Sequence, residues 1–189
     1  MTRSDFMRSL TVALCAASVL STGGARLHGQ TLPTPTLDPR RFLQDMVLAG
    51  LTEVEVAKLA AMRGAPDVAA FARQVARDQS EVNKMLIATA AGLGIQLHTQ
   101  LDALQRGELE RLGGLQGAEF DREFLKLVVL SHEDHVRRLG TMATSGVSVQ
   151  PTPKGLAKNE PDVALWAGHT LPVAQQHLRI ARELQAKHP

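Results

Sequence analysis

Four long stretches of the sequence place apolar residues at the spacing of one helix face, and each is bounded by proline or glycine. The clearest boundary is Asp38-Pro39, where an aspartate suited to capping precedes a proline at the first helical position. The predicted helices cover residues 39–63, 66–92, 117–145 and 159–187, and a short connecting helix covers 100–112. Because tight turns make consecutive helices antiparallel, we expect an all-α chain folded as an antiparallel four-helix bundle.

The composition also favours helices over sheets. Aromatic residues make up 3% of the chain and there is no tyrosine, whereas strands are usually rich in aromatic and β-branched residues. A chain of 189 residues is long enough to bury a sizeable core in one domain and leaves little room for a second.

The first thirty residues differ from the rest of the chain. Arg3 and Arg8 precede an apolar run over residues 10–20, and small residues follow at 21–25, which is the pattern of a secretory signal peptide cleaved after Ala25. A membrane anchor is the alternative, but a bilayer span needs about 20 apolar residues and this run is shorter. We therefore expect an exported protein, periplasmic or associated with the outer membrane, with no transmembrane span in the mature chain. Its parts are a signal peptide (1–25), an extended tether (26–38) and the helical domain (39–187).

Cysteine usage and charge narrow the possible functions. The only cysteine, Cys15, lies inside the predicted leader, so the mature protein would have neither disulfides nor thiolate metal ligands. Without the leader the chain keeps 19 basic and 18 acidic residues, with the two signs interleaved. The sequence therefore lacks the cluster of basic residues that nucleic-acid-binding proteins use, and it argues against nucleic-acid binding. A homo-oligomer or an envelope protein partner remains open.

Several polar residues fall on the predicted apolar helix faces, where each needs a reason to be buried. Counting residues from the turns places three of them at about the same height near the middle of the bundle, and a fourth, His177, about one helical turn away, a difference that loop geometry could absorb. These four candidate metal ligands are Glu53, Asp78, His132 and His177, and weaker candidates are Gln79, Asp121 and His135. Carboxylates combined with imidazoles suit Fe, Mn, Zn or Cu.

Each candidate also has a purely structural interpretation. A lone histidine on an apolar face is commonly a hydrogen-bonded core residue. Glu53 could pair with a buried arginine, and Asp121 could cap the start of its own helix. Taken together, however, two buried carboxylates require counter-charge, which favours a bound cation.

Three segments resemble exported bacterial ferritin-like proteins of the family known as domain of unknown function 4142, whose members are often labelled membrane or outer-membrane proteins. They read FLQDMVLAGLTEVEVAKLAAMRGAPDVAAFARQVARDQSEVNKML, GAEFDREFLKLVVLSHEDHV and TLPVAQQHLRIARELQ. The resemblance covers about residues 39 to 186 and implies a ferritin-like bundle. It also places the family's recurrent polar residues at Glu53, Asp78, Asp121, His132 and His177.

The chain departs from this family in helix two, where the family usually has Asp-His and this sequence has Asp78-Gln79. An amide binds metals less well than an imidazole, so the departure implies a weakened or lost site. Ferritin-like di-iron proteins use Glu-x-x-His on each of two helices, and neither pair is in this sequence. We therefore lean against enzymatic activity and identify no catalytic residue.

Three functions remain open. The first is an exported bundle that binds a single divalent metal, acting in metal handling or envelope stress. The second is a non-enzymatic structural or interaction module of the envelope, in which the metal site is vestigial and the buried polar groups fix helix register. The third and weakest is a bundle that holds haem between methionine and histidine. The sequence lacks the Cys-x-x-Cys-His attachment motif, so such haem would be bound non-covalently.

Overall fold

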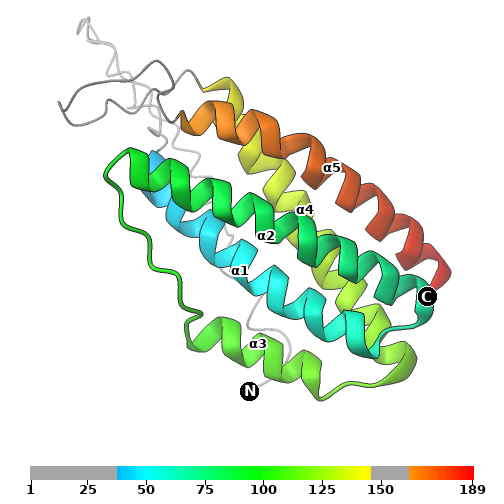
Figure 1. Cartoon of the computed structure of the whole chain (residues 1–189). Coiled ribbons are helices and arrows are strands. Elements are labelled where there is room, and N and C mark those ends of the chain that lie inside the picture. The colour runs from blue at the N-terminus through cyan, green and yellow to red at the C-terminus, as the bar shows by residue number, and fades with distance from the viewer. Residues whose placement is uncertain (1–37, 146–161) are drawn as a thin grey trace, which may run out of the picture. The chain divides into compact units, whose positions relative to one another are not determined.

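The computed structural model of the chain describes residues 38–145 and 162–189, and these residues are entirely helical, without strands (Figure 1). The five helices are α1 (Pro39–Arg63), α2 (Pro66–Gly92), α3 (Ala103–Gly113), α4 (Gly117–Thr144) and α5 (Val163–Lys187). The all-α prediction is confirmed for this part of the chain. The predicted signal peptide, residues 26–37 of the predicted tether and the predicted helix start at 159–161 lie outside the described residues.

The ends of α1 and α2 follow the signals read from the sequence. Asp38 caps α1, because its carboxylate accepts a hydrogen bond from the backbone N–H of Arg40 at 3.0 Å. Gly94, just after α2, has a φ of 70°, and the next N–H, that of Ile95, bonds back to the Ala90 carbonyl at 2.8 Å. Glycine favours this left-handed conformation, so it stops the helix here.

The start of α5 differs slightly from the prediction. The helix begins at Val163, because the side chain of Asp162 accepts hydrogen bonds from the backbone N–H groups of Ala164 and Leu165. An aspartate side chain that accepts hydrogen bonds from the first free N–H groups is a strong N-cap, so the helix starts after Asp162 and not at the predicted residue 159.

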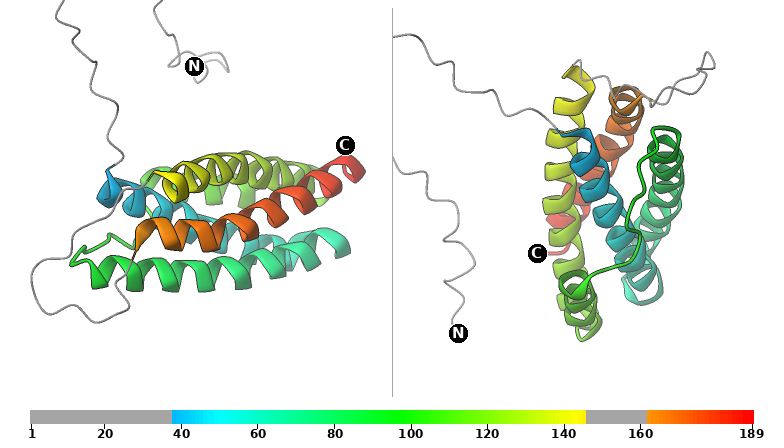
Figure 2. Two further views of the ribbon diagram at one scale, coloured as in Figure 1. Left: turned by 90° about the horizontal axis from the view of Figure 1, so that it is seen from above. Right: turned by 90° about the vertical axis from the view of Figure 1, so that its left-hand side faces the viewer.

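The four long helices lie alongside one another, and α3 lies beside them (Figures 1 and 2). Helix α1 packs chiefly against α2 and α4 against α5, while α2 also contacts α5 and α1 contacts α4. Helix α3 contacts α1 and α4. The segment between α2 and α3 is fixed to α1 by Gln44, whose side-chain amide bonds both the N–H and the carbonyl of His98.

The core consists of two apolar clusters separated by a polar layer. One cluster gathers residues 56–60 of α1, 68–75 of α2, 120–129 of α4 and 178–184 of α5. The other gathers residues 42–47 of α1, 82–90 of α2, 139 and 142 of α4 and 163–174 of α5. Between these levels lie the buried side chains of Glu53, Gln79, His132, His135 and His177. Burying polar groups is unfavourable unless they are paired, so the contacts within this layer decide what it can do.

The outer faces of the helices carry charged pairs, such as Glu55 with Lys58 on α1 and Glu81 with Lys84 on α2. Of the helices that the structure describes, none combines the length and the apolar character needed to cross a membrane.

Candidate metal centre

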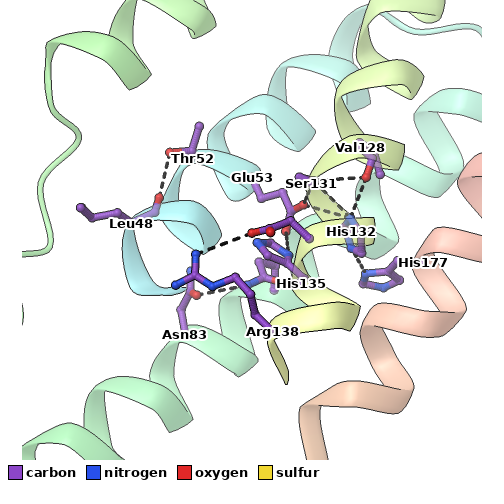
Figure 3. A network of polar contacts seen from close by, with 12 residues as sticks. Leu48, Thr52, Glu53, Asn83, Val128, Ser131, His132, His135, Arg138 and His177 are labelled. Carbon is purple, nitrogen blue, oxygen red and sulfur yellow. Dashed lines mark hydrogen bonds and ion pairs between the residues drawn. The ribbon is translucent and has the colours of Figure 1, made fainter. Parts of the chain in front are cut away.

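Glu53 is the carboxylate of the polar layer, and only 3% of its side chain is exposed (Figure 3). It occupies the face of α1 that also carries the buried residues Val54 and Ala57. Its Oε1 accepts a hydrogen bond from the hydroxyl of Ser131 on α4 at 2.6 Å and lies 3.0 Å from Nδ1 of His132. Helix α4 therefore supplies the partners of this buried charge.

His132 and His135 are one turn apart on α4, so both rings point into the same layer. Nδ1 of His135 lies 3.8 Å from Oε2 of Glu53, which is within ion-pair range but too long for a hydrogen bond. Oε2 is buried and has no hydrogen-bond partner. One oxygen of Glu53 is thus satisfied and the other faces an imidazole across a gap.

Glu53, His132 and His135 could hold a metal ion, because one ligand atom from each lies within 4.8 Å of the others. Metal–ligand bonds of about 2.0–2.1 Å in tetrahedral geometry separate neighbouring ligand atoms by about 3.3 Å. The two Glu53–histidine separations, 3.0 Å from Oε1 to His132 and 3.8 Å from Oε2 to His135, lie on either side of this value. The three groups are therefore close enough to share one cation, with movement of the His135 side chain or the carboxylate toward it.

The family model described as Domain of unknown function (DUF4142) matches residues 26–184, which is most of the chain. This chain belongs to the DUF4142 family. No curated protein and no solved structure matches it.

His177 and Asp78 extend the polar layer of the DUF4142 protein away from Glu53. Nε2 of His132 lies 3.2 Å from Nδ1 of His177, and Nε2 of His177 lies 2.9 Å from Oδ2 of Asp78. The two nitrogens of an imidazole are on opposite sides of its ring, so the contacts form a chain in the order Glu53, His132, His177, Asp78. Its outer end reaches the surface, because 37% of the Asp78 side chain is exposed.

This series of contacts from Glu53 to Asp78 fixes the number of protons on the two imidazole rings. Both outer groups are carboxylates that accept hydrogen bonds, so His132 and His177 must each direct an N–H outward. The contact between the rings needs one further N–H. Three N–H groups on two imidazoles mean that, without a metal, one ring is an imidazolium and the other is neutral.

The directions of the pKa shifts favour His132 as the protonated ring. Burial lowers the pKa of His177, and although burial also opposes charge on His132, the nearby Glu53 carboxylate raises the pKa of His132 overall. Burial would raise the pKa of Glu53, but the charges of His132 and His135 lower it to about 2. Burial lowers the pKa of His135, although the Glu53 carboxylate opposes this shift, and the lowered pKa favours the neutral form of the ring, which is the form that binds metals.

Sequence reasoning overlooked two parts of the DUF4142 site. Ser131 was missed because a serine in a helix is ordinarily a surface residue, although its position one before His132 places it beside Glu53. Asn83 was missed as well. It is buried and accepts a hydrogen bond from Gln79, four residues earlier on the same helix, at 3.3 Å. Both amides pack against the backbone of α1 at Gly50, where a Cβ would lie 2.1 Å from Oδ1 of Asn83.

Gln79 and His135 also line one small cavity of about 10 Å³, together with Trp166 and Thr170. The indole N–H of Trp166 is buried without a hydrogen-bond partner. Gln79, where the family resemblance implies a histidine, thus lies next to a candidate metal ligand.

Asp121 does not join the DUF4142 polar layer. It lies 11 residues before His132 on α4, which is about 16 Å along the helix. Its carboxylate accepts a hydrogen bond from the backbone N–H of Ala65 at 3.2 Å. It therefore supports the turn between α1 and α2. The interpretation that it caps its own helix is wrong, since α4 starts at Gly117 and its N-cap residue, Gln116, receives no side-chain cap.

Proposed function

We propose that this protein is an exported, ferritin-like four-helix bundle that binds one divalent metal ion through Glu53, His132 and His135. The observation that carries this proposal is the buried Glu53 carboxylate, one oxygen of which lacks a hydrogen-bond partner while facing a histidine at 3.8 Å. A cation between these groups would satisfy that oxygen and offset the cost of burying the charge.

The arrangement of the helices supports the bundle. Metal sites in four-helix bundles are built in the core from side chains on facing helices. Here the carboxylate comes from α1 and both imidazoles come from α4, the two helices that contact each other through this layer.

The chemistry of the ligands supports a transition metal. Two imidazoles and one carboxylate suit Zn, Fe, Mn or Cu and leave at least one coordination position for water. The described residues contain no Glu-x-x-His pair on either of two helices, so a di-iron centre is not part of the proposal. Metal handling or envelope stress is the role that fits an exported single-metal protein, and the leader pattern of residues 1–25 supports export.

Thermal unfolding tests the proposal. A ligand that binds only the folded state stabilises it by about 2.7 kcal/mol at a hundredfold excess over Kd, so Zn²⁺ should raise the Tm of the mature protein. His135→Phe removes one ligand and fills similar space, and it should abolish the rise. The exposed His98 is the matched control, and His98→Phe should respond to Zn²⁺ as the parent does.

A second candidate function is the structural or interaction module, and one observation favours it. Oε1 of Glu53 is already paired with Ser131 and His132, so the protein provides partners for this charge without a cation. Under this alternative the polar layer fixes helix register. The parent would then show no Tm response to Zn²⁺, Mn²⁺, Cu²⁺ or Fe²⁺.

A further inference from the structure

We infer that His177 and Asp78 act as positioning residues that orient His132 toward the metal, without binding the metal themselves. This inference rests on the proposed function. It assigns each of the four long helices a part in one site, with ligands from α1 and α4 and the positioning pair from α5 and α2.

The order of contacts places His177 outside the ligand set. Glu53 meets Nδ1 of His132 at 3.0 Å, whereas His177 meets Nε2 of that ring at 3.2 Å. A metal beside Glu53 would bind the Nδ1 side of His132, and the ring itself would separate His177 from the metal. Asp78 lies one ring farther away, bonded to Nε2 of His177.

The hydrogen-bond inventory would also be complete with a cation in place of the proton on Nδ1 of His132, a nitrogen that lies 3.0 Å from both Oε1 of Glu53 and the backbone carbonyl of Val128. His132 then keeps its proton on Nε2 and donates it to Nδ1 of His177, and His177 donates its own Nε2 proton to Asp78. Every nitrogen in the chain has a partner and both rings are neutral. This series of hydrogen bonds can therefore accommodate one divalent cation in place of one proton.

The pair of His177 and Asp78 selects one tautomer of His132, the residue that would bind the metal. Metal-binding histidines usually donate their second N–H to a carboxylate or carbonyl, which fixes the ring and raises its basicity, and removal of that partner commonly weakens metal affinity 10–100-fold. Here the carboxylate acts through a second imidazole. The packing of Phe71 edge-on against the His177 ring, with centroids 6.2 Å apart, holds the intermediate ring in place.

The decisive experiment compares Asp78→Ala with a matched control in the mature protein. Asp78 is partly exposed, so its truncation should leave the fold intact. The control is Asp67→Ala, because Asp67 on α2 also pairs with a histidine, His188, just beyond the end of α5 and away from the metal site. We expect Asp78→Ala to raise the Kd for Zn²⁺ about 10–100-fold, Asp78→Asn to raise it less, and Asp67→Ala to leave it unchanged.

Pulsed electron paramagnetic resonance of the Cu²⁺-loaded protein separates positioning from ligation by counting coordinated imidazoles. We expect two in the parent, two in Asp78→Ala and two in His177→Phe. Three imidazoles in the parent, with one lost in His177→Phe, would overturn the inference while leaving metal binding intact. A Zn²⁺ affinity of Asp78→Ala equal to that of Asp67→Ala would overturn it too. A parent that binds neither Zn²⁺ nor Cu²⁺ would refute the proposed function together with the inference.

Discussion

Replacing Glu53 by glutamine should make the stability of the metal-free protein depend differently on pH. The pKa of Glu53 falls from 4.5 to about 2 in the folded protein, so ionised Glu53 contributes about 3 kcal/mol to the free energy of unfolding near neutral pH. Because the folded pKa is depressed, this contribution is fully present well above pH 4.5 and is lost as the pH falls through the folded value near 2. At pH 3, between the folded and unfolded pKa values, only part of it should remain. Glutamine has the shape of the neutral acid but cannot ionise.

Urea unfolding followed by far-UV circular dichroism, after dialysis against EDTA, measures this effect. The deficit of Glu53→Gln relative to the parent should be about 3 kcal/mol larger at pH 7 than at pH 2. Glu55→Gln is the matched control, because Glu55 lies on the same helix with 44% of its side chain exposed, and surface pairs of this kind contribute at most about 1 kcal/mol. A deficit for Glu53→Gln that stays constant between pH 7 and pH 2 would refute the assignment of a buried, stabilised carboxylate.

Two further substitutions test the amide pair beside the site. Gly50→Ala should destabilise the protein by about 1–3 kcal/mol in urea unfolding, because the new Cβ would lie 2.1 Å from Oδ1 of Asn83, whereas Gly140→Ala, with open space around the position, should stabilise it by up to about 1 kcal/mol. Equal effects of the two would contradict the close packing of α1 on α2. Gln79→His should lower the Kd for Zn²⁺ in calorimetric titration, because residue 79 shares a cavity with His135, and unchanged or weaker affinity would count against a site that an added imidazole can strengthen.

The helices were largely predictable because their boundaries are local. Pro39 and Pro66 start α1 and α2 where the sequence places them, and the glycines after each helix end them. The start of α5 was less accurate, because the sequence signal begins at residue 159 whereas the hydrogen bonds of Asp162 define the first turn. The contact of α2 with α5 depends on tertiary packing, for which local signals give no direct evidence.

The burial of Glu53, His132 and His177 was also predictable from helix periodicity, and Asp78 proved only half-buried. Periodicity and counting from turns give the face and height of a residue but not its rotamer. They therefore could not show that His135 faces Glu53 while His177 lies behind His132, because this difference depends on which ring nitrogen each side chain presents.

Equilibrium dialysis of the mature protein against Zn²⁺, followed by elemental analysis, tests the central claim most directly. The parent should retain about one Zn²⁺ per chain, and Glu53→Gln and His135→Phe should retain far less, because each loses one of three ligands. Asp45→Asn, a change in a surface carboxylate of the same helix that pairs with Arg138, should retain as much as the parent. No bound metal in the parent, or equal retention by all four proteins, would contradict a metal centre at Glu53, His132 and His135.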